Sequence, residues 1–327
     1  MQFTQTLMGL AYIGLVMAGS PALAQTAQNY PVKTIRVVVP FPPGGTSDVL
    51  GRIVGIKLTE KWGQQILIES RAGAGGMIGT ELVARAQPDG YTLLLSDMRS
   101  IMIANLLHPK PTFDYIRDFA PVMEMSYSPH LLGTHPSLPV KNVKELIALA
   151  KKRPGELNFA AAIAGAPQLA GVEFANRAGI RWTYIIGRGG MQTVMDVVSG
   201  QADVMFNGML ATLPQVQSGR LKLLAVTSAK RVASLPDTPT IAESGMPGFV
   251  TGSWQGILAP AGTPPEILAK IHAEISRILS TPDIKEKLMA QGAEPLNTPP
   301  AETAKSLREE RDRLVKLFQD TGYKGQQ

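Results

Sequence analysis

Apolar and polar residues alternate in blocks along the chain, and these blocks predict strands and helices in turn. The apolar run at 35–39 predicts a buried strand, and apolar residues at helical spacing between 49 and 58 predict the helix that follows it. The runs at 65–69 and 91–95 predict two further strands, each leading into a loop. This alternation is typical of α/β layers.

The same pattern recurs beyond residue 119, where we expect a second lobe. A predicted strand at 157–160 leads into a loop of small residues at 161–166 and then a helix at 168–177. Another glycine-rich loop opens a helix at 191–198, which precedes a predicted strand at 202–206.

The chain is then predicted to return to the first lobe. An extended segment at 250–258 makes the return, and helices at 265–279 and 300–318 follow it. A chain that leaves one lobe, builds another and comes back crosses between them twice. Two crossings suit hinge closure around a ligand.

Two strand-to-helix junctions in the first lobe are rich in glycine. The first is Pro-Phe-Pro-Pro-Gly-Gly-Thr-Ser-Asp at 40–48, where Thr46 or Ser47 is placed to cap the next helix. The second is Arg-Ala-Gly-Ala-Gly-Gly-Met-Ile-Gly at 71–79. Glycine lets the backbone turn and lets a ligand approach, and the following helix supplies free N–H groups. Two such loops predict a small anion-binding floor that needs no charged side chain.

The first 24 residues have the pattern of a secretory signal peptide. An apolar run at 7–19 ends in Ala22-Leu23-Ala24, although no Lys or Arg precedes it. We expect cleavage after Ala24 and an exported chain from Gln25 to Gln327.

Composition narrows the function classes. The chain has no cysteine, which excludes disulfides, thiol catalysis and zinc–thiolate sites. Its net charge of +6 comes from scattered residues without aromatic interleaving, which disfavours nucleic acid and weakly favours anionic solutes. The four histidines lack metal-ligand spacing, and no P-loop or serine-hydrolase motif occurs, so we expect no metal, cofactor or catalytic residue.

Several motifs resemble those of the tripartite tricarboxylate transporter substrate-binding proteins, also called the Bug family. They include the two glycine-rich loops, Ala-Gln-Pro-Asp-Gly-Tyr-Thr-Leu-Leu at 86–94, Asp-Phe-Ala-Pro-Val at 118–122 and Leu-Ala-Pro-Ala-Gly-Thr-Pro at 258–264. The resemblance covers nearly the whole mature chain. It implies a type II periplasmic binding-protein fold, in which two α/β lobes joined by two crossing segments enclose a ligand cleft.

On that fold we expect residues 25–125 and 254–327 to form the first lobe and 126–253 the second. The resemblance implies a periplasmic, non-enzymatic and monomeric protein that captures a small carboxylate and presents it to membrane permease subunits. A signalling partner, or an enzyme on the same two-lobe frame, is the alternative.

The expected ligand-binding residues follow from the loops. The carboxylate floor is assigned to Phe41, Gly44, Gly45, Thr46, Gly73, Ala74, Gly75 and Gly76, with Ser96 from a third loop. Asp48 is kept out of contact because an acid there would repel the ligand. The wall of the second lobe is assigned to Ala161, Gly165, Ala166, Gly187 and Asn207. That wall is more apolar than the family pattern, which suggests an apolar or aromatic acid.

Two arginines are candidates for the ligand's second acid group. Arg99, in the third loop, is predicted to offer a bidentate guanidinium, unless it pairs with Asp97 or faces solvent. Arg188 carries the same two readings.

Overall fold

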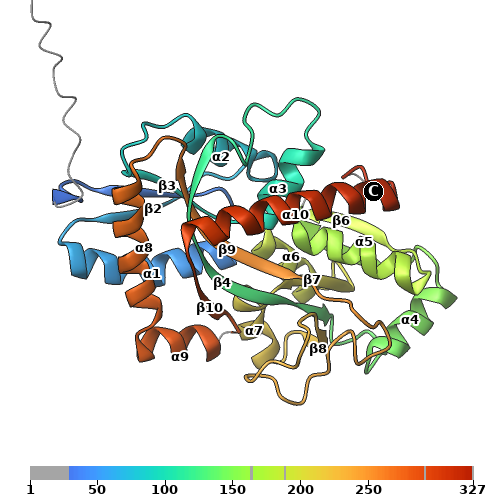
Figure 1. The fold of residues 1–327 in the computed structure, drawn as a ribbon. Helices are drawn as coiled ribbons and strands as arrows, with labels where there is room; N and C mark the ends of the chain where they lie inside the picture. Colours follow the sequence, from blue (N-terminus) through green and yellow to red (C-terminus); the bar gives the residue numbers. More distant parts are fainter. Residues whose placement is uncertain (1–28, 163–164, 188, 291, 326–327) are drawn as a thin grey trace, which may run out of the picture.

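Two α/β lobes share one long strand. The structure is a computed structural model that describes residues 29–162, 165–187, 189–290 and 292–325. The predicted signal peptide and Arg188 lie outside the described residues. The shared strand is β4 (Phe119–Thr134), and Figure 1 shows it running through the middle of the molecule.

The described elements follow one another in an α/β order. The other strands are β1 (Ile35–Val39), β2 (Ile66–Ser70), β3 (Thr92–Asp97), β5 (Asn158–Ala162), β6 (Thr183–Gly187), β7 (Val204–Gly208), β8 (Lys222–Val226), β9 (Gly252–Pro260) and β10 (Glu294–Thr298). The helices are α1 (Thr46–Trp62), the 3₁₀ turn η2 (Ala74–Gly76), α2 (Met77–Ala84), α3 (Met98–Leu107), α4 (Val143–Lys152), α5 (Ala166–Ala178), α6 (Gly190–Val198), α7 (Met209–Gln217), α8 (Pro265–Leu279), α9 (Pro282–Ala290) and α10 (Pro300–Thr321).

The first lobe is a sheet in the order β2-β1-β3-β9-β4 with helices on both faces. Strands β1, β2 and β3 are parallel, whereas β9 runs antiparallel to β3 and β4. One face packs on α1 and α8, whose buried side chains include Leu50, Val54, Ile271 and Ile275. The other face is covered by α2, α3 and α10.

The second lobe is built on β7, β5 and β6, with β7 and β8 paired to the end of β4. Its core is aromatic: Trp182 stacks on Phe159 and Phe174, and Phe206 stacks on Phe249.

The chain crosses between lobes where β4 changes partners. Pro129 still pairs with Gly252 of β9, whereas His130 pairs with Gly208 of β7. The second crossing, just before Gly252, lies beside the first because the Thr251 N–H bonds to the carbonyl of Thr227, and the Thr227 N–H bonds to that of His130.

The predicted alternation is confirmed, with corrections to single elements. The helix predicted at 265–279 has those bounds, and the strand predicted at 202–206 is displaced to Val204–Gly208. The loop predicted at 96–100 is instead the end of β3 and the start of α3.

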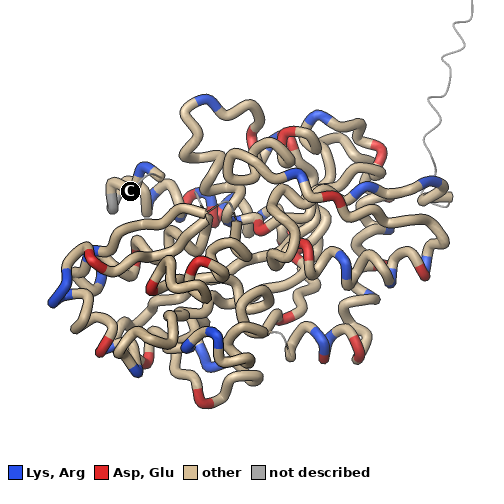
Figure 2. The backbone as a smooth tube through the Cα atoms, turned by 180° about the vertical axis from the view of Figure 1, so that it is seen from behind, with Lys and Arg blue, Asp and Glu red and all other residues tan. Residues whose placement is uncertain are grey.

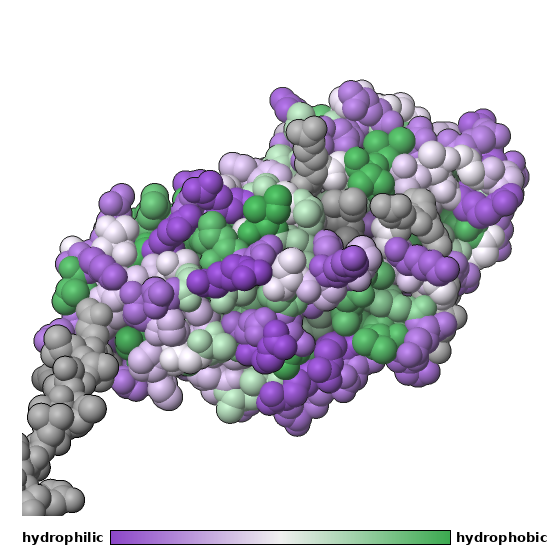
Figure 3. All heavy atoms as spheres, turned by 90° about the horizontal axis from the view of Figure 1, so that it is seen from above, coloured by the Kyte–Doolittle hydropathy of each residue, from purple (hydrophilic) through white to green (hydrophobic). Residues whose placement is uncertain are grey.

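Charged residues are interspersed over the surface. Figure 2 shows basic and acidic positions mixed along the backbone, and on the face shown in Figure 3 hydrophobic residues form separate patches between hydrophilic ones. Among the helices that the structure describes, none has the length and apolar character needed to cross a membrane.

Candidate functional site

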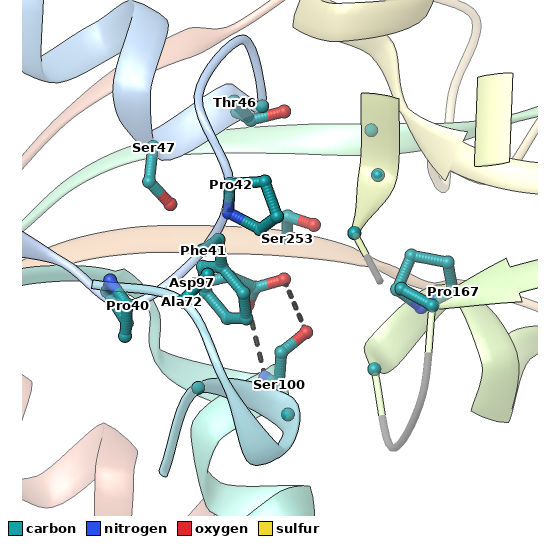
Figure 4. A pocket seen from close by; sticks show the side chains of 18 of the residues that line it. Pro40, Phe41, Pro42, Thr46, Ser47, Ala72, Asp97, Ser100, Pro167 and Ser253 are labelled. Carbon is teal, nitrogen blue, oxygen red and sulfur yellow. Dashed lines mark hydrogen bonds between the residues drawn. The ribbon is translucent and has the colours of Figure 1, made fainter. Parts of the chain in front are cut away.

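A cavity of about 630 Å³ lies between the two lobes. Its walls come from the loops after β1, β2, β5, β6 and β7, from the start of α3 and from the start of β9. Figure 4 shows Phe41, Pro42 and Asp97 on one side of it and Pro167 on the other. Among the lining residues that the structure describes, none is Lys or Arg.

The wall is made largely of helix N-termini that begin after glycines. Helices α1, α2, α5, α6 and α7 have N-caps that line the cavity and form no side-chain capping bond: Gly45, Gly76, Gly165, Gly189 and Gly208. The expected capping of α1 by Thr46 or Ser47 is therefore wrong. Helix starts without a side-chain cap leave N–H groups and positive dipole ends at the cavity wall, and these favour an anion. At α5 one of these groups, the Ala166 N–H, is already bonded to Ser100 Oγ.

Most of the predicted first-lobe floor lines the cavity. Phe41, Gly45, Thr46 and the stretch 73–76 are all in its wall. The second loop needs its glycines, since Gly73, Gly75 and Gly76 have φ values of 145°, 67° and 96°. Gly44 is not in the wall. Its N–H bonds to Asp48, and a Cβ there would face Met191.

The third loop presents different residues from those predicted. Ser96 is fully buried beside Tyr115, and Arg99 turns away to pair with Glu310 of α10 at 3.0 Å in a separate cavity of about 300 Å³. Asp97 and Ser100 line the interlobe cavity instead. Asp97 and Ser100 lie together because Asp97 is the N-cap of α3 and accepts the N–H of Ser100, three residues further on.

The second-lobe wall is partly as predicted. Gly165, Gly187 and Asn207 line the cavity. Ala161 is buried in β5, and its neighbour Ala162 lines the cavity in its place. Ala166 is also buried, and its N–H donates to the Ser100 Oγ at 2.9 Å, a bond that joins α5 to α3.

Sequence reasoning also missed lining residues on the return strand. Ser253 and Gln255 of β9 both face the cavity, and the Ser47 hydroxyl donates to the Gln255 Oε1 at 2.5 Å. An extended segment was predicted there, and alternation along a strand puts residues two apart on one face. This alternation could have identified Ser253 and Gln255, but no recognisable motif marks the segment. Other lining residues that were not predicted include Pro40, Pro42, Ala72, Pro167, Ile186, Gly189, Gly190 and Ala211.

The cavity's two described acids differ in their partners. Asp48 forms a two-point ion pair with Arg52, at 2.9 Å and 3.0 Å, and accepts the N–H of Gly44. Asp97 accepts hydrogen bonds from Ser100 and Ser253, and among the described residues it has no ion-pair partner. Burial raises the pKa of Asp97, and these hydrogen bonds oppose the rise.

A buried histidine connects this site to the crossing segments. His130 is fully buried, with Nδ1 3.1 Å from the Thr251 hydroxyl and Nε2 3.1 Å from the Ser253 hydroxyl. Burial, with a smaller effect of Arg99, lowers the pKa of His130 to about 3, so its ring is neutral at pH 7. Ser253 thus lines the interlobe cavity and also contacts His130 in the first crossing segment. The described residues contain no group of three His, Asp or Glu side chains placed to hold a metal ion.

The fold and site define a class of protein, and comparisons with known proteins agree. Residues 50–323 match the family model described as tripartite tricarboxylate transporter family receptor, and the chain belongs to this family. Its fold is that of a type II periplasmic binding protein, with two lobes around a cleft.

Three relatives place the chain within the family. It is 36% identical to Protein BugT of Bordetella pertussis over 96% of this chain and 98% of that protein. The structure of the periplasmic binding protein BugD matches with a TM-score of 0.84 at 33% identity, covering 90% of this chain and 99% of that one. R. palustris Rpa4515 with adipate matches with a TM-score of 0.86 at 32% identity, covering 90% and 98%.

Proposed function

We propose that this protein captures a small carboxylate in the interlobe cavity and delivers it to a tripartite tricarboxylate-type membrane transporter. The observation that carries the proposal is the set of glycine-capped helix starts that surround a cavity with no described cationic side chain. Oriented N–H groups bind a carboxylate without long side chains that would have to be ordered on binding. The adipate bound to the R. palustris relative supports the same ligand class.

The two lobes have different tasks in this proposal. The first lobe, which the chain leaves after Pro129 and re-enters at Gly252, holds one carboxylate on the floor made by Thr46 and the loop at 73–76. The second lobe, between these two crossings, closes over the rest of the ligand. Its lining includes Ala162, Pro167, Ile186 and Ala211, so an apolar or aromatic end fits this side.

Closure is the step that a permease partner would recognise. The first loop already touches the second lobe: a Cβ on Gly189 would lie 2.8 Å from Pro42, and one on Gly208 would lie 2.8 Å from Thr46. Contacts this close depend on the relative position of the lobes, and a ligand that bridges the lobes stabilises that position. We place the protein in the periplasm as a monomer, after cleavage following Ala24.

A thermal-shift screen of the mature chain against mono-, di- and tricarboxylates, including aromatic acids, tests the proposal. Binding to the native state must raise the melting temperature by mass action. We expect a clear rise for a narrow set of acids, with each ligand recovered unchanged. Absence of a shift with every acid would refute carboxylate capture, and chemical conversion of the ligand would favour an enzyme.

A further inference from the structure

Asp97 is a buried acid in the wall of a cavity that otherwise favours anions. It is 7% exposed, it lines the interlobe cavity, and it forms no ion pair with any described residue. Asp48 provides the contrast, because Arg52 neutralises it. A negative charge at 97 repels any anion in the cavity, so the reason for it has to lie in contacts within the protein.

Helix capping alone does not account for the charge. Asp97 caps α3, but Asn142 caps α4 with the same bond from the residue three places on. Asn and Asp are equally good N-caps. The carboxylate differs from the amide as an acceptor, because both of its oxygens accept hydrogen bonds, whereas an amide has one accepting oxygen and a donating NH₂ group.

Ser100 connects Asp97 to the second lobe. Its N–H lies 3.3 Å from Oδ1 of Asp97, and its hydroxyl donates to Oδ2 at 2.8 Å (Figure 4). Because the carboxylate takes the hydroxyl proton, the Ser100 oxygen is left as an acceptor, and it accepts the N–H of Ala166 at 2.9 Å. Helix α3 belongs to the first lobe and α5 to the second, so this one hydroxyl joins the two lobes.

Ser253 connects Asp97 to the crossing segments. Its hydroxyl is hydrogen-bonded to Asp97, and its oxygen lies 3.1 Å from Nε2 of His130. With the serine proton directed to the carboxylate, Nε2 carries the proton of the neutral ring and donates it to Ser253. Nδ1 is then an acceptor, 3.1 Å from the hydroxyl of Thr251 in the second crossing. The ring thus bridges both crossing segments.

We propose that Asp97 is a positioning residue for lobe closure, whose carboxylate orients the Ser100 hydroxyl toward the second lobe and the Ser253 hydroxyl toward the ring that bridges the crossings. Both lines of hydrogen bonds end on one carboxylate, so loss of its second accepting oxygen disturbs both. This role needs no contact between Asp97 and the ligand. The importance of closure rests on the proposed carboxylate capture, whereas the hydrogen bonds can be tested without a ligand.

The proton on the His130 ring reports the orientation of Ser253. Nitrogen-15 NMR of the ligand-free mature chain distinguishes a protonated Nε2 from a protonated Nδ1, and His130→Gln identifies the signals. In the wild-type protein we expect a single form with the proton on Nε2. In Ser253→Ala this proton loses its acceptor and should move to Nδ1, where Thr251 can accept it. We expect the same movement in Asp97→Asn or Asp97→Ser, both of which keep a capping group.

The position of the lobes is measured by spin labels. The chain has no cysteine, so Lys61→Cys on α1 and Lys151→Cys on α4, both at exposed positions, give one label in each lobe. Pulsed electron paramagnetic resonance of the ligand-free protein then gives the distribution of interlobe distances. In both Asp97 variants we expect the ratio of the wild-type distance to longer or shorter ones to fall by about fivefold to tenfold, the effect of losing one hydrogen bond.

Ser128→Ala is the matched control. Ser128 is a buried serine that pairs with Ser253 across β4 and β9, but its hydroxyl donates to the carbonyl of Gly292. Its removal should change neither the His130 proton nor the interlobe distances. A lower melting temperature in both Asp97 variants, with the ring proton and the distances unchanged, would reduce Asp97 to a helix cap and overturn the proposal. If the variants behave as expected but no acid binds the wild-type protein, carboxylate capture is refuted and the positioning role stands.

Discussion

The two sides of the cavity are built from the same device but with different side chains. Each lobe brings helix starts capped by glycine to the cavity. The first lobe adds Thr46, Ser47, Asp97 and Ser100, whereas the second adds mainly small or apolar residues around Asn207. Under the proposed function, the first side would fix the charged group of the ligand and the second would select the shape of what remains.

The largest effect is expected from a substitution that disrupts the floor of the first lobe. Gly75 has a φ of 67°, a conformation that a β-branched residue cannot easily adopt. Gly75→Val should therefore weaken carboxylate binding at least about 100-fold, measured by calorimetry. Its melting temperature without ligand is the control, and an undiminished affinity in the folded variant would remove this loop from the site.

The next effect concerns closure of the second lobe onto the first. A Cβ at Gly189 would lie 2.8 Å from a ring carbon of Pro42, so Gly189→Ala should hold the lobes apart. We expect roughly tenfold weaker binding and a smaller ligand-induced decrease in radius of gyration by X-ray scattering. Gly219→Ala is the control for binding: a Cβ there meets no atom within 4 Å, and although the φ of 72° should lower the stability, the variant should bind normally. Equal compaction in both variants would contradict the closure contact.

A smaller effect tests the apolar wall. Ile186 lines the cavity and is 44% exposed, so a ligand can cover its free surface. Ile186→Asn should lower the affinity for an acid with an apolar tail by about threefold to tenfold and change that of a short acid less. Met195→Gln alters an exposed apolar residue outside the cavity and serves as the comparison. Equal losses for long and short acids would count against selection by this wall.

The last prediction concerns folding stability at the crossing segments and not ligand binding. His130 has a pKa of about 3 in the folded chain and about 6.5 when unfolded, so the unfolded state binds the extra proton between these values. Its contribution to the free energy of unfolding is complete above about pH 6.5 and is lost as the pH falls toward about 3, by at most about 1.4 kcal/mol per pH unit.

Urea unfolding between pH 7 and pH 4 measures this slope. His130→Gln should reduce the pH dependence of the free energy of unfolding by the equivalent of up to one bound proton. His135→Gln changes a partly exposed histidine and is the comparison. Identical slopes in the wild-type protein and His130→Gln would show that the ring accepts a proton in the folded state.

The fold and most of the first-lobe floor could be predicted from the sequence, because both depend on patterns within short segments of the chain. Periodicity places β1 and α1, and glycine between them predicts a loop that a ligand can approach. The third loop was predicted poorly. The sequence did not locate the start of α3 to within one residue, and this error selected Ser96 and Arg99 in place of Asp97 and Ser100. Ser253 and Gln255 were missed because only the pairing of β9 with β3 and β4 brings them to the cavity.

A crystal structure of the mature chain with its tightest-binding acid tests the central claim most directly. The account predicts a carboxylate in the interlobe cavity, with its oxygens within hydrogen-bond distance of backbone N–H groups at the start of α1 and in the loop at 73–76. A carboxylate bound instead to Arg99 in the cavity beside α10, or held in the interlobe cavity by side chains alone, would contradict it.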